Sequence, residues 1–193
     1  IDLAGFVRRY GLDPEATAQR VLPPCFDYAE QLTVRTSPLA CTDWRGKSEE
    51  YARLVRAAPP DKACLLLFTS KARVRGVSAD LRVASGRRGA RAVAAQGEGE
   101  SVEALARRLK ADAGRTVVCG TKSFWAGLDV DTLGVLVVDK LPYAQDFKPR
   151  QALLSGCGRR AQFDNEYLAR MLHELVQGVG RVVRSAQCKG LVL

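Results

Sequence analysis

Short, unbroken apolar runs, separated by helix-like segments, constrain this chain more than any other feature. The first run covers residues 63–69, and further strand candidates cover residues 90–95, 115–119, 134–139 and 190–193. A strand that is apolar along its whole length is typical of burial on both faces. The pattern therefore predicts an α/β fold, with a mostly parallel sheet and helices on both faces.

The segments between these runs carry helical signals. Amphipathic patterns cover residues 47–57, 102–111 and 167–176, and the basic stretch that follows residue 70 also has a helical start. A helical pattern covers residues 1–22 as well, where Pro14 after Asp13 is a helix-start signal. Residues 31–35 are a further extended candidate.

The charge balance indicates a polyanionic partner. The chain has 193 residues, 30 Lys and Arg against 21 Asp and Glu, and a formal net charge of +9. Such an excess favours nucleic acid, although a basic face can also be a solvated surface. The hydrophobic fraction of 47% excludes a disordered chain.

The six cysteines are widely spaced and form no Cys-x-x-Cys pair, which excludes the usual zinc and iron–sulfur spacings within this chain. They are expected to be reduced, buried and single, as in a cytoplasmic protein. No apolar run is long enough to span a bilayer and no signal peptide is recognisable. The chain starts with Ile and ends inside a strand-like run, so we expect a fragment of a longer protein.

Residues 177–184, Gln-Gly-Val-Gly-Arg-Val-Val-Arg, have the composition of a phosphate clamp. Two arginines three positions apart lie on one face if the segment is helical, and their planar, permanently charged forks suit a developing phosphate charge. The alternative interpretation is an exposed basic helix start.

Hydroxyl groups and lysines follow two of the predicted strands, at residues 69–71 and 120–123. The second of these segments lacks the Gly-Lys pair of a P-loop. Phe124 and Trp125 can either stack on bases or pack against the sheet. Because ligands gather at the carboxyl ends of parallel strands, these segments and residues 177–184 are expected to converge on one edge of the sheet.

Five segments in this order resemble the second motor domain of DinG/XPD-type superfamily 2 DNA helicases. Residues 24–31 resemble the entry to that domain, residues 65–70 motif IV, residues 120–130 motif V, residues 138–143 the strand and turn after it, and residues 177–184 motif VI. The resemblance implies that residues 61–193 form a RecA-like motor domain, and residues 1–60 a mostly helical or irregular lead-in.

The resemblance also implies roles for particular residues. Arg181 and Arg184 would be arginine fingers for the γ-phosphate of ATP. Gln177 and Gly180 would lie beside the nucleotide, while Gly127 and Asp129 would couple it to the DNA loop. Single-stranded DNA would contact Thr69, Ser70, Lys71, Gly120, Thr121, Lys122, Ser123 and Trp125.

By the same resemblance, ATP and Mg²⁺ would be held mainly by a first motor domain of the same protein. An iron–sulfur cluster would belong only to that part, and this chain alone is expected to be inactive. The family translocates 5′ to 3′ on single-stranded DNA.

One departure keeps a second interpretation open. Ala126 stands where family members usually have an acidic residue, which removes a polar link in motif V. The alternative is a RecA-like scaffold that binds nucleic acid without hydrolysis. The paired arginines of motif VI favour the helicase, because a module that only binds has no need of them. The basic tract at residues 71–91 is either extra backbone contact or a solvated face.

Overall fold

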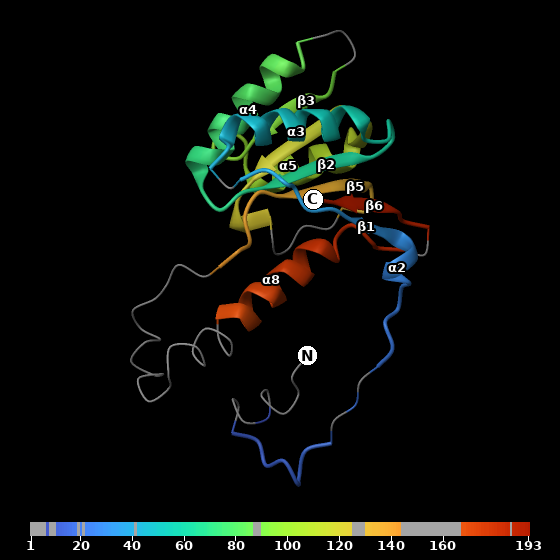
Figure 1. Cartoon of the computed structure of the whole chain (residues 1–193). Coiled ribbons are helices and arrows are strands. Elements are labelled where there is room, and N and C mark those ends of the chain that lie inside the picture. Colours follow the sequence, from blue (N-terminus) through green and yellow to red (C-terminus); the bar gives the residue numbers. More distant parts are fainter. Residues whose placement is uncertain are drawn as a thin grey trace.

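The protein is an α/β domain built on one six-stranded sheet (Figure 1). The computed structural model describes residues 7, 11–18, 20, 22–40, 42–86, 90–124, 130–143, 167–185 and 187–193. The strands are β1 (Leu32–Val34), β2 (Ala63–Leu67), β3 (Ala92–Ala95), β4 (Thr116–Gly120), β5 (Leu133–Val138) and β6 (Gly190–Val192).

All neighbouring strands run parallel, in the order β1-β6-β5-β2-β4-β3. The predicted fold class is therefore confirmed. Strands β2 and β4 are buried along their whole length, as expected for the central strands of a parallel sheet.

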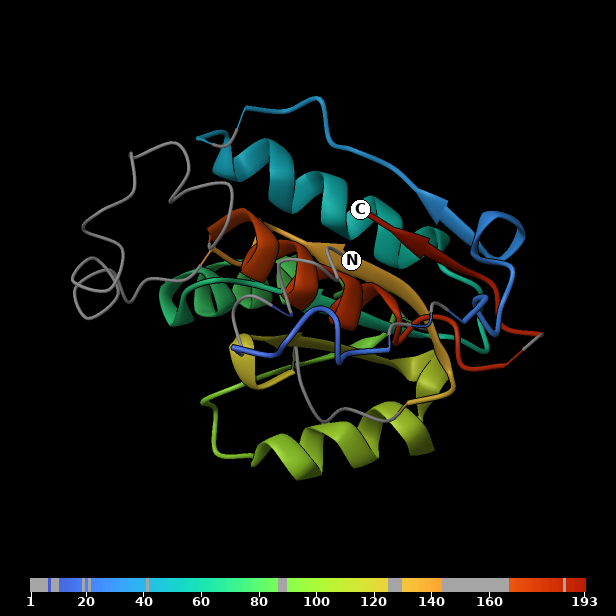
Figure 2. The same ribbon diagram turned by 90° about the horizontal axis from the view of Figure 1, so that it is seen from below.

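Helices cover both faces of the sheet. Those described are α2 (Tyr28–Gln31), α3 (Trp44–Ala57), α4 (Lys71–Ala84), α5 (Val102–Ala111) and α8 (Ala169–Val179), with the 3₁₀ turns η1 (Ala113–Arg115) and η2 (Lys122–Phe124). Helices α3 and α4 lie on one face and α8 on the other (Figure 1). Figure 2, seen from below, shows α8 crossing in front of the sheet with α5 to one side.

The side chains of β2 alternate between two hydrophobic layers. Leu65 and Leu67 pack with α5 and α8, whereas Cys64 and Leu66 pack with α3 and α4. Burial raises the pKa of the Cys64 thiol to about 11 and that of Cys119 to about 12. Both are free and buried as predicted, but Cys25 is exposed.

The lead-in differs from its prediction. Residues 14–16 form a turn instead of starting a helix, because the Asp13 carboxylate accepts from the backbone N–H of Glu15 as in an Asx turn. Both β1, which pairs with β6, and the sheet-covering helix α3 come from residues before 61. The sheet therefore draws on the lead-in as well.

Two glycines allow a matched test of packing. A Cβ on Gly114 would meet the Pro60 carbonyl oxygen at 1.7 Å, whereas a Cβ on Gly76, within α4, would meet nothing within 4 Å. Gly114→Ala is expected to lower the free energy of unfolding by about 1–3 kcal/mol. Gly76→Ala is expected to raise it by about 0.5–1 kcal/mol, because alanine is the better helix former. Urea denaturation of both variants measures the difference, and equal effects would contradict this packing.

Candidate nucleotide and nucleic-acid interfaces

The carboxyl end of β2 carries the first group of predicted DNA residues. Thr69, Ser70 and Lys71 are all exposed where the strand ends and α4 begins. Ser70 is the N-cap of α4, and its hydroxyl accepts from the backbone N–H of Arg73 at 3.2 Å. The exposed N-terminus of a 14-residue helix beside Lys71 is a favourable position for a phosphate group.

The carboxyl end of β4 carries the second group, and it is held by a residue that sequence reasoning missed. Gln96, which follows β3, accepts from both the backbone N–H and the hydroxyl of Thr121, each at 2.8 Å. Its amide nitrogen donates to the Ser123 hydroxyl at 3.2 Å. Gln96 thereby ties this loop to the neighbouring strand. A polar residue directly after a predicted strand was the available signal.

Phe124 belongs to the core instead of the surface. Its side chain is fully buried, and a Cβ on Gly120 would meet its ring at 2.3 Å. The packing interpretation of Phe124 is therefore confirmed, and Gly120 is required for that packing. Lys122 lies in η2. Trp125, Ala126, Gly127 and Asp129 lie outside the described residues.

The arginines of residues 177–184 do not share a helical face. Helix α8 ends at Val179, with Gly180 as its C-cap and a turn after it. Gln177 is exposed on the last turn of α8, Arg181 is only 8% exposed, and Arg184 is exposed. The expectation of two arginines side by side on a helix was wrong, because the helix ends at the glycines that precede them.

These residues also lie at the opposite edge of the sheet from Thr69 and Thr121. Gln31, just before β1, donates to the backbone carbonyls of Ser185 at 2.7 Å and Cys188 at 2.9 Å. A Cβ on Gly190, the first residue of β6, would meet the Val182 side chain at 2.0 Å. Val182, Ser185 and Cys188 therefore pack at the strand starts. The expectation of one shared edge was wrong. A crossover helix returns the chain to the side of the sheet formed by the amino ends of the strands, the amino edge, whereas Thr69 and Thr121 lie at the side formed by the carboxyl ends, the carboxyl edge.

The described ends of the segment between β4 and β5 lie at different edges. The segment leaves β4 at the carboxyl edge, where Thr121 is held, and enters β5 at the amino edge, where the Thr132 carbonyl accepts from the backbone N–H of Ala63 at 2.9 Å.

A buried polar cluster at the carboxyl end of β5 was not predicted. The Asp139 carboxylate accepts from the Tyr51 hydroxyl at 2.8 Å and from the Arg73 guanidinium at 3.1 Å, and the Lys47 ammonium lies 3.4 Å from the Asp139 carbonyl oxygen. The Asp139 side chain is 0% exposed and that of Arg73 is 14% exposed. Burial and the neighbouring carboxylate raise the pKa of Tyr51 far above its usual range. The cluster ties α3 and α4 to β5.

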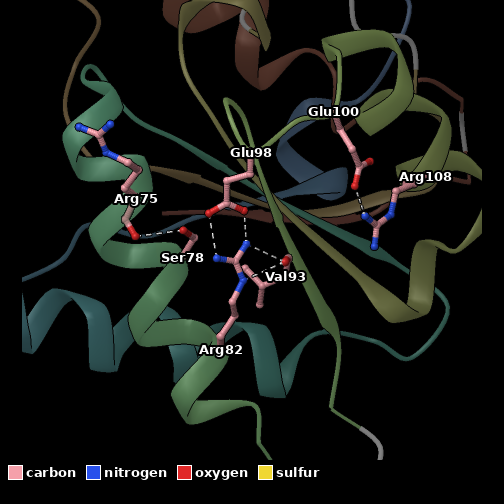
Figure 3. A network of polar contacts seen from close by, with 7 residues as sticks. All are labelled: Arg75, Ser78, Arg82, Val93, Glu98, Glu100 and Arg108. Atoms are coloured by element: carbon pink, nitrogen blue, oxygen red, sulfur yellow. Dashed lines mark hydrogen bonds and ion pairs between the residues drawn. The ribbon is translucent and has the colours of Figure 1, made fainter.

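Much of the basic tract at residues 71–91 has structural partners. The Arg82 guanidinium pairs with the Glu98 carboxylate and donates to the Val93 carbonyl on edge strand β3, while the Arg75 side chain points away (Figure 3). Arg91 donates to backbone carbonyls at the end of α3 and beside it, those of Ala58, Pro59, Lys62 and Ala113. Arg91 thus binds backbone carbonyls of the fold, whereas Arg82, whose side chain is 41% exposed, lies on a solvated face with an ion-pair partner. Contact of this tract with a nucleic-acid backbone stays a prediction.

Neither a metal-binding cluster nor a membrane-spanning helix is found in the described segments. They contain no group of three or more His, Cys, Asp or Glu side chains that could hold a metal ion. Within the same ranges, no helix is long and apolar enough to cross a membrane.

Comparison with known proteins agrees with this architecture. A solved XPD helicase superposes with a TM-score of 0.57 at 14% identity, covering 84% of this chain and 30% of that one. Domain 2 of the DEAD-box helicase Mss116p, bound to an RNA duplex, gives 0.54 at 13% identity, covering 84% of this chain and 53% of that one. At such identities the likeness shows the RecA-like helicase fold alone.

Curated relatives and a family profile carry the assignment further. The ATP-dependent DNA helicase YoaA of Escherichia coli (strain K12) is 31% identical over 200 residues, covering 100% of this chain and 30% of the relative. YoaA of Haemophilus influenzae is 28% identical over 196 residues, covering 97% of this chain and 29% of the relative. The chain thus spans less than a third of these relatives. The profile described as Helicase C-terminal domain matches residues 52–193. The chain therefore belongs to the helicase C-terminal domain family of the DinG/XPD type.

Proposed function

We propose that this chain is the second motor domain of an ATP-dependent DNA helicase that moves 5′ to 3′ along single-stranded DNA. One observation supports the proposal: the two predicted groups lie on opposite edges of one sheet. The arginines lie at the amino edge, and the hydroxyl-bearing loops lie at the carboxyl edge. A motor needs such an arrangement, because nucleotide state must reach a separate strand-binding surface.

The amino edge is proposed to face ATP held by a first motor domain of the same protein. Arg184, which is exposed, is proposed to reach across to the γ-phosphate together with Arg181, and Gln177 and Gly180 are proposed to lie beside the nucleotide. Mg²⁺ is assigned to the first domain, so this chain alone is expected to hydrolyse no ATP. Gly127 and Asp129 are proposed to couple the two edges.

The carboxyl edge is proposed to hold the DNA backbone. Thr69, Lys71 and the α4 N-terminus offer donors to one phosphate region, and Lys122 and Ser123 are proposed to offer donors to the next. Thr121, whose N–H and hydroxyl both donate to Gln96, is proposed to contact the strand as part of this loop, beside Trp125. Strands β2 and β4, which carry these groups, are adjacent. The free, buried thiols of Cys64 and Cys119 agree with action in the cytoplasm.

Lys71→Ala in the full-length protein is expected to weaken binding of single-stranded oligo-dT in a salt-dependent manner. Each phosphate contact contributes about 0.7 to the slope of log K against log salt, so the slope should become shallower by about that amount. Fluorescence anisotropy across a salt series measures it.

Lys189→Ala is the matched control, since Lys189 is an exposed lysine next to β6 at the amino edge. It should leave both affinity and slope unchanged. Equal losses in the two variants would indicate unspecific attraction to the basic surface, and would contradict a DNA interface at the carboxyl edge.

A further inference from the structure

The aromatic side chain of Trp44 lies beside the proposed DNA surface, and none of the contacts proposed above includes it. Trp44 is the first residue of α3, whose N-cap is Asp43, and the residue is 41% exposed. Two cations lie over its ring: the Arg73 guanidinium is 4.4 Å and the Lys140 ammonium 4.6 Å from the ring centroid. The elements that meet here are α3, α4 and the end of β5.

The two cations are held differently. Arg73 is anchored by its ion pair with the fully buried Asp139 carboxylate, so its guanidinium is fixed against the indole. Lys140 is exposed and has a flexible stem. A cation–π contact at an exposed site is weak, so Lys140 can leave the ring for a stronger partner.

This ring lies in line with the proposed backbone contacts. Strands β2 and β5 are neighbours, with Leu67 in register with Val138. Lys71 and Lys140 therefore follow adjacent strand ends, and Arg73 is two residues into α4 from Lys71. Donors and cations therefore follow the carboxyl ends of three adjacent strands, β4, β2 and β5, and the Trp44 ring lies with Arg73 and Lys140 at the β5 end of this group.

We propose that Trp44 is a base-stacking residue for single-stranded nucleic acid and that Lys140 binds the adjoining phosphate. The inference rests on the proposed function and extends its DNA surface beyond motifs IV and V. A base stacks on the exposed part of the indole, whose position is fixed by Arg73. Stacking tolerates any sequence, because every base has a π-face. The lysine that the base displaces is then close to that nucleotide's phosphate.

The test measures binding of the full-length protein to oligo-dT and to an abasic deoxyribose-phosphate strand of equal length. Trp44→Leu keeps an apolar cover over Arg73 but cannot stack, and it should weaken oligo-dT binding by roughly 5- to 150-fold. Trp44→Phe should retain most of the affinity. On the abasic strand, wild type and Trp44→Leu should bind equally. Lys140→Ala should reduce the salt slope by about 0.7 on both strands.

Tyr28→Ala is the control for the loss of an exposed ring. Tyr28 is also 41% exposed, but it lies in α2 before β1, at the other edge. It should leave oligo-dT binding unchanged. Equal affinities of the Leu and Phe variants, or equal losses of Trp44→Leu on both strands, would overturn the inference. If Lys71→Ala weakens binding while Trp44→Leu does not, only this extension fails. If wild type fails to bind oligo-dT, the proposed function fails.

Discussion

Arg184→Ala in the full-length protein is expected to lower ATP turnover by about 10³–10⁵-fold. Arginine fingers contribute this much in phosphoryl transfer, where catalysis depends on positioning and charge stabilisation. ATP binding should weaken far less, since the first motor domain is proposed to hold most of the nucleotide. Arg184→Lys should not restore turnover fully, because an ammonium cannot form the two parallel hydrogen bonds of the guanidinium. Steady-state ATPase assays with saturating DNA measure these differences.

Thermal stability separates this role from a structural one. Arg184 is exposed and Arg181 is only 8% exposed, so the loss of Arg184 should lower the Tm less than the loss of Arg181. Arg45→Ala is the control: its side chain is 93% exposed on α3, and turnover should stay at the wild-type level. Wild-type turnover in Arg184→Ala, or a loss that follows unfolding, would contradict the finger assignment.

The strands of this fold could be predicted from the sequence because burial on both faces leaves a direct trace. Residues 63–67 and 116–120 are buried without interruption, and both segments read as apolar runs. The helix-start signals in the sequence did not all produce a helix. Ser101 caps α5 as expected, but Asp13 forms a turn among mostly exposed residues. A start signal needs an apolar face to pack before it produces a helix.

The division of the site between two edges could not be obtained by placing each motif near a strand. Residues after a strand lie at the carboxyl edge, whereas residues after a crossover helix lie at the amino edge. Thr121 follows β4, and Arg184 follows α8. The correct edge follows from whether a strand or a helix precedes the motif. The prediction of one shared edge did not take this topological step.

The Asp139 cluster was missed because its members are far apart in sequence. Tyr51 and Lys47 are 88 and 92 positions from Asp139, so no local pattern joins them. A carboxylate directly after an apolar strand was the only trace. Such a residue stays buried only when partners from other elements satisfy it.

Asp139→Ala is expected to lower the free energy of unfolding of this chain by about 3–5 kcal/mol. Removing one partner of a buried ion pair leaves the other charge uncompensated. Here the Arg73 guanidinium and the Tyr51 hydroxyl both lose their acceptor, and contacts that tie α3 and α4 to β5 are lost. Tyr51→Phe removes one hydrogen bond and should lower the free energy of unfolding by about 0.5–1.5 kcal/mol. Urea denaturation with a common m-value gives both numbers.

Asp80→Ala, an exposed carboxylate on α4, is the control and should change stability by no more than about 0.5 kcal/mol. A double-mutant cycle then identifies the cause. Because Tyr51 acts through Asp139, Tyr51→Phe should cost almost nothing once Asp139 is alanine. Full additivity of the two changes, or an Asp139→Ala loss no larger than that of Asp80→Ala, would show that the buried carboxylate does not hold these elements together. Arg73 would then lack its anchor, and the fixed cation beneath the Trp44 ring would lose its structural basis.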